Sequence, residues 1–449
     1  MVKKYDVIIV GGGPAGIFAA LELSQTPGLR ILLIEKGRDI DQRTNLVCGL
    51  GGAGAYSDGK LTLTPEVGGR LQDYLGKSET GTLIKYVGDT YLRFGAPNKL
   101  YGVGDEVDKV SRQASLAGMH LIPVPMRHLG TERCRSILKA IRDYLISRLE
   151  LKLEVAACRV ITNGGMVKGV KTETGERFNC NYLMLAPGRE GADWLATEAK
   201  RLKLTLYNNP VDVGVRVEVP TAVMAELSNV LYEAKLEFLS QSFDDRIRTF
   251  CMCPAGEVTM ETTGGSDPVI TVNGHSYANH KTHNTNFALL VSTDFTEPFR
   301  EPIAYGKYLA RLANILSGGI LIQRLGDLRE GHRSTPTRIE RGIVKPTLKE
   351  ATPGDLSFVL PYRHLTGIME MIEALDKLAP GVASRHTLLY GVEVKFYSCR
   401  PHLGPSLETE VRNLFAAGDG AGVSRGLIQA SASGVVAARE ILRRSGHRG

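Results

Sequence analysis

The chain has 449 residues, of which 43% are hydrophobic and 23% charged, and its formal net charge is +7. This length allows about two or three domains, and the composition is ordinary for a globular protein. No segment offers the roughly 18 uncharged apolar residues that a membrane span requires, and no signal-peptide cleavage site follows Lys3 and Lys4. We therefore expect a cytoplasmic protein without a membrane span. The mild positive charge permits anionic substrates or RNA and requires neither.

Seven cysteines are scattered over the chain, at positions 48, 134, 158, 180, 251, 253 and 399. An odd, dispersed set in a large protein is typical of reduced thiols rather than of a disulfide framework. Only Cys251 and Cys253 are clustered, and neither a second cysteine pair nor a histidine stands at ligand spacing. We therefore predict no metal site.

The chain opens with a strand, a glycine-rich turn and a helix. The apolar run 5–10 leads into Gly11-Gly12-Gly13-Pro14-Ala15-Gly16, a helical pattern follows to position 23, and a second apolar run ends at Glu35. A G-x-G-x-x-G turn between a strand and a helix, with an acidic residue about 20 positions later, is the dinucleotide-binding fingerprint.

Each residue of this fingerprint has a separate role. Gly11 permits the tight turn, Gly13 lets the backbone approach a pyrophosphate, and Gly16 lets the helix pack closely on the strand. The N-terminus of the helix then directs its free N–H groups at the phosphates. Glu35 would accept hydrogen bonds from a ribose hydroxyl and repel a 2′-phosphate. The motif therefore predicts FAD or NAD rather than NADP.

A second glycine-rich segment, residues 48–60, has a different character. Gly49, Gly51 and Gly54 match G-x-G-x-x-G formally, but no strand precedes them and no helix is obvious after them. We therefore reject a second dinucleotide-binding unit here. So many glycines instead offer backbone that can lie against a flat ligand and donate N–H groups to it.

The middle of the chain alternates helical and strand-like patterns. Residues 70–125 show mixed helix and loop patterns, and 131–149 has the spacing of an amphipathic helix. Three strand-like runs, at 152–161, 166–173 and 177–180, are joined by glycine-containing turns and predict a β-meander. Residues 182–186 then resemble a buried parallel strand.

Residues from about 205 to 400 have the pattern of an inserted domain, and the end of the chain returns to the first pattern. Strand-like runs at 211–219 and 287–293 alternate with loops and with helices near 302–316 and 365–378. A short apolar strand at 414–417 ends at Gly418-Asp419, and 427–442 predicts a helix rich in small residues.

The predicted fold class is therefore α/β. A Rossmann-like dinucleotide-binding domain with a β-meander is split by an inserted mixed α+β substrate domain. We place the discontinuous cofactor domain at 1–204 and 402–449, and the substrate or cap domain at 205–401.

These motifs together resemble FAD-containing proteins of the glutathione-reductase superfamily, which implies that the discontinuous domain is an FAD-binding domain of the glutathione-reductase type. The resemblance rests on the fingerprint with Glu35, on Ala186-Pro187-Gly188 after a mid-chain strand, and on the strand that ends in Gly418-Asp419. Within that superfamily, segments 51–60, 253–286 and 418–434 resemble a family of FAD-dependent dehydrogenases of bacteria and archaea, related to geranylgeranyl-reductase-like flavoproteins.

The resemblance implies a set of residues that hold non-covalent FAD. Asp419 would bind the ribityl chain or the pyrophosphate, and the helix that starts near Arg425 would direct its N-terminus at the flavin N1 and C2 carbonyl. The complete set of implied cofactor-binding residues is Gly11, Gly13, Pro14, Ala15, Gly16, Glu35, Lys36, Gly52, Ser57, Gly188, Gly418, Asp419, Arg425, Gly426 and Leu427.

Two features of related flavoproteins are missing from the chain. Disulfide reductases carry C-x-x-x-x-C after the second strand, whereas here Cys48 stands alone with Ala53 at the partner position. A second strand, glycine turn and helix for NAD(P)H is also not found. Electrons would therefore come from a transiently bound NAD(P)H, from a redox partner protein or from the substrate itself.

Hydride transfer also needs a group that handles the proton. We select Tyr56, His283, Tyr397 and Cys399 as candidate catalytic residues, with His275 and Tyr277 as further loop candidates. The family has a Thr-x-Ser-Ser-Pro-like run where this chain has Phe396-Tyr397-Ser398-Cys399-Arg400-Pro401. Residues 327–338 are predicted to form a surface loop. Within it, Arg329 and Arg333 could bind a carboxylate or phosphate of the substrate.

The leading functional prediction is an FAD-dependent oxidoreductase that transfers a hydride through flavin N5. The expected chemistry is C=C reduction or dehydrogenation of a small organic substrate. One alternative is an NAD(P)H-dependent flavin monooxygenase. Another is a flavoprotein that binds or modifies RNA, suggested by the basic segments 324–341 and 439–448, although such charge runs are usually solvated surfaces. A last alternative is a flavin with a structural or sensing role.

Overall fold

The computed structural model describes residues 3–43, 48–57, 59–207, 209–262, 268–276, 281–293, 301–396 and 398–446. The chain forms two compact units. The first unit contains Met1–Leu100, Pro125–Asn209 and Ser398–Gly449, and the second contains Tyr101–Val124 and Pro210–Tyr397. Our boundaries from the sequence differ from this division chiefly at residues 101–124. There Met119–Leu121 (β4) pairs with Leu236–Leu239 (β12) of the second unit.

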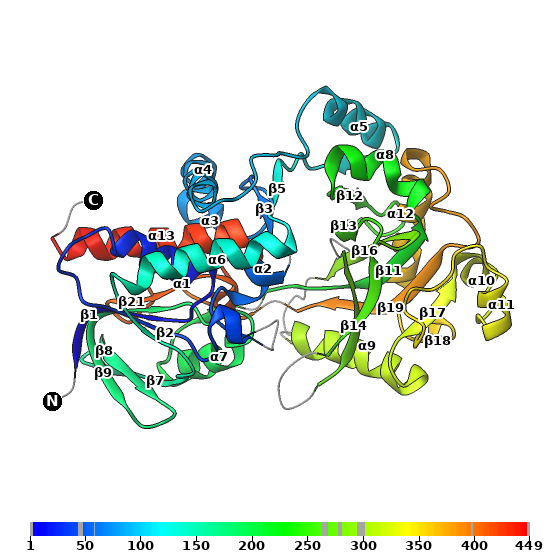
Figure 1. The fold of residues 1–449 in the computed structure, drawn as a ribbon. Coiled ribbons are helices and arrows are strands. Elements are labelled where there is room, and N and C mark those ends of the chain that lie inside the picture. Colours follow the sequence, from blue (N-terminus) through cyan, green and yellow to red (C-terminus); the bar gives the residue numbers. More distant parts are fainter. Residues whose placement is uncertain are drawn as a thin grey trace. The chain divides into compact units, whose positions relative to one another are not determined.

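A mixed sheet forms the centre of the first unit (Figure 1). Its strand order is β6-β2-β1-β9-β8-β7, with β21 also paired to β9. Strands β6, β2, β1, β9 and β21 run parallel, and β7 and β8 add an antiparallel meander to β9. The bounds are β1 Lys4–Val10, β2 Ile31–Ile34, β6 Glu150–Lys152, β7 Ala157–Asn163, β8 Met166–Thr172, β9 Arg177–Leu185 and β21 Leu414–Ala416.

The strand at 177–185 shows how two apolar runs become one element. We expected a meander strand at 177–180 and a separate buried strand at 182–186, but β9 is continuous. Its first half pairs antiparallel with β8, its second half pairs parallel with β21, and β1 lies parallel along its other edge. One strand therefore belongs to both the meander and the parallel sheet.

The expected strand at 152–161 is also divided differently. Residues 150–152 form β6, which pairs parallel with β2, and the meander begins only at β7. Glu154, between them, has a φ of 55°, in the left-handed region that ends a regular strand. A short helix, α2 (Gly52–Ser57), forms where we saw none in the sequence.

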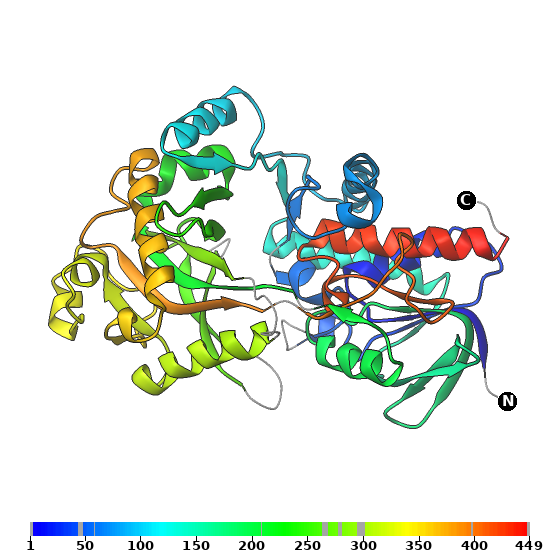
Figure 2. The ribbon, with the colours of Figure 1, turned by 180° about the vertical axis from the view of Figure 1, so that it is seen from behind.

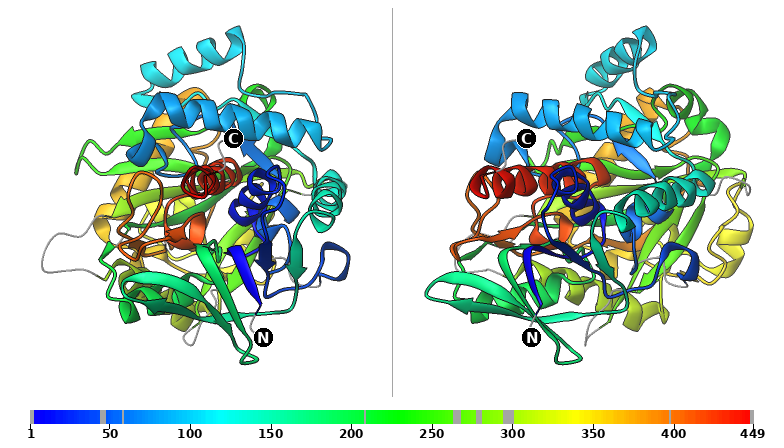
Figure 3. Two further views of the ribbon diagram at one scale, coloured as in Figure 1. Left: turned by 90° about the vertical axis from the view of Figure 1, so that its left-hand side faces the viewer. Right: turned by 60° about the vertical axis from the view of Figure 1, so that its left-hand side comes forward.

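Helices α1 (Pro14–Leu23) and α13 (Leu427–Arg444) lie side by side on the sheet (Figures 2 and 3). Their closest approach is at Gly434, where an added Cβ would lie 2.0 Å from the carbonyl oxygen of Ala15. Small residues on both helices allow this approach, which brings the last segment of the chain against the first.

The remaining elements of the first unit are shorter or lie at its edges. Two small antiparallel pairs are formed by β3 with β5 and by β10 with β20. Their bounds are β3 Lys60–Thr62, β5 Met126–His128, β10 Leu206–Tyr207 and β20 Arg400–Pro401. The helices are α3 Gln72–Leu75, α4 Lys77–Arg93, α6 Thr131–Ile146 and α7 Ala192–Arg201, with 3-10 turns η1 Ile40–Gln42 and η3 Asp419–Ala421.

The second unit is built on an eight-stranded sheet. Its order is β18-β17-β19-β11-β16-β13-β12-β4, and only the β17–β18 pair is parallel. The bounds not yet given are β11 Val211–Pro220, β13 Arg246–Cys253, β16 Asn284–Thr293, β17 Leu321–Arg324, β18 Thr352–Pro353 and β19 Leu388–Lys395. The hairpin β14 (Glu257–Thr262) and β15 (Ile270–His275) forms a separate sheet.

Helices of the second unit complete its core. They are α5 Asp105–Leu116, α8 Thr221–Leu231, α9 Pro302–Ser317, α10 Leu325–Arg329, α11 Pro336–Glu340 and α12 Tyr362–Leu378, with the 3-10 turn η2 Leu356–Phe358. The valines at odd positions of β11 belong to one hydrophobic cluster with residues of α8, α9 and α12. One face of the sheet is therefore apolar and packed against helices, as the alternation of β11 requires.

The other face of β11 is polar and equally buried. Arg216 is fully buried, and its Nη1 donates to both oxygens of Glu393 at 3.1 and 3.0 Å. Its Nε donates to Asn286 Oδ1 at 2.7 Å, and its Nη2 donates to the carbonyl of Cys251 at 2.6 Å. Although burial disfavours the charge, the Glu393 carboxylate raises the pKa of Arg216. An added Cβ at Gly274 would lie 2.3 Å from Nη2, so β15 crosses directly over the guanidinium.

Helix α12 carries a buried histidine in its first turn. His364 Nε2 lies 3.2 Å from Thr293 Oγ1, and Nδ1 has no hydrogen-bond partner among the residues that the structure describes. Burial lowers the pKa of His364 to about 4, because the protonated ring would lose its hydration.

This histidine predicts a pH dependence of stability. The unfolded chain takes up a proton near pH 6.5, whereas folded His364 does so only near pH 4. The free energy of unfolding should therefore fall between these values as the pH decreases, by on the order of 3 kcal/mol. His364→Gln does not titrate, so its unfolding free energy from urea denaturation should vary less over this window. The same pH dependence of the unfolding free energy in the wild type and in His364→Gln would show that His364 is not its source.

Within the described residues, no helix combines the length and the apolar character that a membrane crossing requires.

Candidate functional site

Three loops of the first unit follow neighbouring parallel strands at the same edge of its sheet. One follows β1 at Gly11, one follows β9 at Ala186, and one follows β21 at Ala417. Glu35 follows β2, which pairs with β1 on the other side. In open α/β sheets, the carboxyl ends of the strands are where ligands bind.

Among the glycines of the β1–α1 turn, only Gly13 has room for a side chain. An added Cβ at Gly11 would lie 2.0 Å from the carbonyl oxygen of Ala186, and one at Gly16 would lie 1.9 Å from that of Gly11. At Gly13 the nearest atom would be Gly52 Cα, at 3.8 Å. Gly13 is also the N-cap of α1, with no side-chain hydrogen bond to the first turn. The turn thus presents open backbone and helix N–H groups at one place.

Glu35 is buried and holds two backbone segments together. Its Oε2 accepts a hydrogen bond from the Gly12 N–H at 2.7 Å, and its Oε1 accepts one from Gly37 at 2.8 Å. Oε1 also accepts a weak hydrogen bond from Cys48 Sγ at 3.9 Å, so it is Oε2 that retains a further lone pair for a hydroxyl donor. Lys36, the next residue, lies 3.5 Å from the carboxylate of Glu190, and so its charge is directed to the loop after β9.

The loop after β21 is shaped by Gly418 and Asp419. Gly418 has a φ of 77°, and its N–H donates to Ser433 Oγ at 3.0 Å. Asp419 Oδ1 accepts a hydrogen bond from Ser424 Oγ at 2.6 Å, and Oδ2 lies 3.9 Å from Arg189 Nε. The carboxylate is therefore oriented by its neighbours and remains partly exposed.

Helix α13 begins at this loop without a side-chain cap. Its N-cap residue Gly426 is extended and makes no side-chain hydrogen bond to the first turn. An added Cβ at Gly54 of α2 would lie 2.9 Å from Leu427 Cδ2, and one at Gly52 would lie 3.1 Å from Gly13 Cα. Helix α2 therefore lies close to the N-termini of both α1 and α13.

The segment 65–71 also belongs to this site, and sequence reasoning missed it. Gln429 Nε2 donates to the carbonyls of Pro65 and Val67 at 3.1 and 3.0 Å, and its Oε1 accepts from Leu71 N–H at 3.2 Å. The Arg425 N–H donates to the Gly68 carbonyl at 2.8 Å. The signal in the sequence was the pair of adjacent glycines, Gly68 and Gly69. Both have a positive φ in the structure, a conformation that favours glycine.

Tyr56, a candidate catalytic residue, lies in α2 as a buried ring. The guanidinium carbon of Arg43 is 4.0 Å from its ring centroid, and that of Arg135 is 5.0 Å away. Arg43 Nη1 also donates to the carbonyls of Leu50 and Gly52, at 3.0 and 2.9 Å. Tyr56 is therefore part of the packing of α2. The side chain of Ser57 lies outside the described residues.

The other candidate catalytic residues are divided between the two units. Cys399 is half-buried in the first unit, and burial raises the pKa of its thiol. His283 is exposed in the second unit, as is His275 at the end of β15. Tyr397 and Tyr277 lie outside the described residues.

The basic segment after β17, which we expected to be a surface loop, includes parts of α10 and α11 and is held by internal contacts. Arg329 Nη1 donates to the Ala383 carbonyl at 2.9 Å, and its Nη2 lies 3.6 Å from Glu373. Asp327 is buried and accepts hydrogen bonds from Arg324 and Arg338; these outweigh the effect of burial and lower the pKa of Asp327. The loop therefore contains an internal ion network, while Arg333 remains exposed.

The second basic segment is likewise ion-paired. Arg439 Nε lies 2.7 Å from Glu22, and Arg444 Nη1 lies 2.6 Å from Glu408. These pairs give no support to an RNA-binding surface. Among the described residues, no group of three or more histidines, cysteines or acids is arranged to hold a metal.

Three protein-family models match parts of the chain. A model described as FAD binding domain matches residues 6–75, which include the β1–α1 turn and Glu35. A model described as FAD-dependent protein, C-terminal domain-like matches residues 210–396. The chain is an FAD-dependent flavoprotein. A third model, Glucose inhibited division protein A, matches residues 346–448 of this flavoprotein.

Individual proteins resemble the flavoprotein over almost its whole length. It is 28% identical to an uncharacterized protein of Clostridium beijerinckii, over 98% of the flavoprotein and 81% of that protein. L-proline dehydrogenase from P. horikoshii is 14% identical with a TM-score of 0.46, covering 100% and 95% of the two chains. The 3-ketosteroid-delta4-(5alpha)-dehydrogenase from Rhodococcus jostii is 14% identical with a TM-score of 0.46, covering 98% and 97%.

Proposed function

We propose that this flavoprotein transfers a hydride between a small organic substrate and flavin N5, in C=C reduction or dehydrogenation. FAD, when bound, supplies the two-electron hydride chemistry. The observation that carries the proposal is the convergence of three loops and two uncapped helix N-termini at one sheet edge of the first unit. We further propose membership in the bacterial and archaeal FAD-dependent dehydrogenase family related to geranylgeranyl-reductase-like flavoproteins, on the segments that suggested it in the sequence.

The proposed cofactor contacts follow from what each loop presents. The open backbone at Gly13 and the first N–H groups of α1 would hold the pyrophosphate. Glu35 would accept a hydrogen bond from an adenosine ribose hydroxyl with its remaining lone pair, and Asp419 would accept one from a hydroxyl of the ribityl chain. The other proposed contacts are Gly11, Pro14, Ala15, Gly16, Lys36, Gly52, Ser57, Gly188, Gly418, Arg425, Gly426 and Leu427.

The N-terminus of α13 would act on the redox end of the cofactor. A helix N-terminus stabilises nearby negative charge by roughly 0.3–2 kcal/mol. Because Gly426 leaves the first-turn N–H groups without a side-chain cap, they are available to the flavin N1 and C2 carbonyl. This arrangement favours the reduced flavin and would raise its potential.

The substrate would be bound with the help of the domain that we place at 205–401. Tyr56, His283, Tyr397 and Cys399 remain the candidates for the proton. Burial raises the pKa of Cys399, so a thiol rather than a thiolate would be present there at neutral pH. Because the guanidinium groups of Arg43 and Arg135 contact its ring, Tyr56 also has a role in packing α2.

Anaerobic titration of the purified protein tests the proposal. We expect yellow protein that releases FAD on denaturation, is bleached by NADH, NADPH or a reduced substrate, and is reoxidised by an organic acceptor with two electrons per flavin. Reoxidation that requires O₂ and places one of its atoms in the product would favour the monooxygenase. Protein that fails to take up FAD would overturn the central claim.

A further inference from the structure

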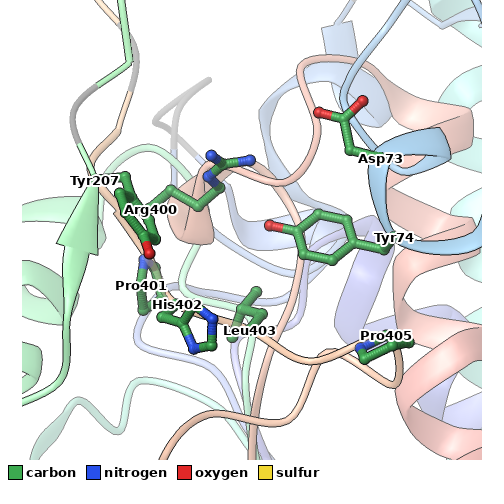
Figure 4. Close-up of a pocket in the computed structure, with 8 residues that line it drawn as sticks. All are labelled: Asp73, Tyr74, Tyr207, Arg400, Pro401, His402, Leu403 and Pro405. Atoms are coloured by element: carbon green, nitrogen blue, oxygen red, sulfur yellow. The ribbon is translucent and has the colours of Figure 1, made fainter.

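The first unit contains a pocket of about 250 Å³ at the β10–β20 pair (Figure 4). Tyrosines, a histidine and one arginine provide most of its polar groups. Its lining residues are Asp73, Tyr74, Tyr207, Arg400, Pro401, His402, Leu403 and Pro405. This volume is below the roughly 300–1,000 Å³ of sites for drug-sized ligands, so the pocket suits a small group or one end of a larger molecule.

Arg400 provides the charge of this pocket. Its guanidinium carbon is 5.6 Å from the ring centroid of Tyr207, and in Figure 4 the guanidinium and the Tyr74 hydroxyl point toward each other. Among the described residues, no carboxylate lies within ion-pair distance of Arg400. A guanidinium presents N–H donors in a fork that matches a carboxylate, and here the fork faces the pocket without an acidic partner.

Tyr74 adds a neutral donor beside this charge. Burial raises the pKa of Tyr74, although the nearby Arg400 lowers it in part. The phenol therefore remains protonated at neutral pH and can donate a hydrogen bond to an anion. His402 lies across the pocket, with its ring centroid 6.1 Å from that of Tyr207. The guanidinium of Arg400 and the hydroxyl of Tyr74 thus line the same space, together with the ring of His402 and the carboxylate of Asp73.

The pocket adjoins the loop that follows β21. An added Cβ at Gly422 would lie 3.1 Å from Arg400 Cβ and 2.9 Å from the carbonyl oxygen of Ser398. Asn209 Nδ2 donates to that same carbonyl at 2.7 Å, which ties the strand of Arg400 to the end of β10. Gly422 is three residues from Asp419, so an anion held by Arg400 would lie next to residues that we assign to the cofactor.

We propose that Arg400 and Tyr74 bind a carboxylate of the substrate, and that the substrate is therefore an organic acid. This inference rests on the proposed function, because it takes the loop after β21 as part of the cofactor site. A monoanion fits better than a phosphate, because the carboxylate of Asp73, which lies 3.9 Å from Arg70 Nε, lines the same pocket and opposes a second negative charge. Arg400 and Tyr74 act as binding and positioning residues in this proposal.

Calorimetric titration of the FAD-loaded protein tests the inference without turnover. The probes are sodium propionate, sodium benzoate, the isosteric neutral propionamide and inorganic phosphate. We expect at least one carboxylate to bind below 50 mM, about the range where simple anions are measured, and the amide to bind at least about tenfold more weakly. Arg400→Gln should weaken carboxylate binding at least about tenfold, because the charged donors are lost, and Arg400→Lys should have an intermediate effect.

The controls separate this inference from the function itself. Arg177→Gln removes an exposed arginine of β9 and should leave carboxylate binding unchanged. FAD content shows whether each variant is folded. Equal binding of propionate to wild type and Arg400→Gln, phosphate binding tighter than propionate, or no carboxylate binding below about 50 mM would each overturn the inference. These results would leave the reduction of the flavin by NAD(P)H or substrate as an independent test of the oxidoreductase.

Discussion

Gly13→Ala is expected to give a folded protein that binds FAD about 10–100-fold more weakly, because it interferes with hydrogen bonds to a charged group. Gly13 has an ordinary extended backbone with a φ of −82°, and its added Cβ would approach no atom of the protein closer than 3.8 Å. Folding therefore tolerates the methyl group. The space that it enters is where the backbone would approach the pyrophosphate. FAD affinity, from the fluorescence of released cofactor, and the melting temperature of the apoprotein measure the two effects separately.

Gly81→Ala is the matched control for this substitution. Gly81 lies within α4, has no atom within 4 Å of an added Cβ, and stands away from the sheet edge. Alanine there should leave FAD affinity unchanged and raise helix stability by about 0.5–1 kcal/mol. Gly16→Ala should instead damage the fold, since its Cβ would lie 1.9 Å from the Gly11 carbonyl oxygen. Unaltered FAD affinity of Gly13→Ala would contradict the assignment of the turn.

Arg216→Met is expected to lower the free energy of unfolding of the second unit by about 3–5 kcal/mol. The methionine would leave the carboxylate of Glu393 without its main partner in a fully buried position. Lys395, at 3.0 Å from Glu393 Oε1, compensates only part of that charge. Urea denaturation followed by circular dichroism measures the loss, with intrinsic fluorescence used to resolve separate transitions of the two units.

The double variant Arg216→Met with Glu393→Met tests the reason for this loss. Removing both charges leaves no carboxylate to be desolvated, so much of the stability should return. Arg177→Met, on the exposed side of β9, should change stability by less than about 0.5 kcal/mol. The interpretation would be contradicted if Arg216→Met were as stable as the wild type. It would also be contradicted if the double variant were no more stable than Arg216→Met, because the unpaired carboxylate of Glu393 would then not be the cause of the loss.

Local patterns in the sequence were sufficient to predict a dinucleotide-binding turn and much of the fold. The fingerprint at 11–16 and Glu35 lie within one strand-turn-helix-strand unit, so the role predicted for each residue follows from its neighbours along the chain. The strict alternation of valine with other residues at 211–219 likewise predicted a strand, because side chains of a strand alternate between its faces.

Contacts between distant segments were beyond the reach of those patterns. Gln429 holds a segment more than 350 positions earlier in the chain, and neither side of that contact has a periodic signal. Tyr56 was selected as a catalytic candidate, but only the fold shows the two guanidinium groups that cover its ring. Alternating valines could not show that the opposite face of β11 is buried as well, since burial there depends on the β14–β15 hairpin.

The sequence by itself therefore predicted a dinucleotide-binding turn followed by an acidic residue at the position expected for a ribose acceptor, because these features are encoded within about 30 consecutive residues. The tertiary structure alone decided which residues meet at the end of β21 and at Arg400. The lining of that pocket comes from positions 73–74, 207, 400–403 and 405, which lie near one another only because β10 pairs with β20 and the chain end packs against its start. Such pairings depend on the packing of the whole unit and leave no local pattern.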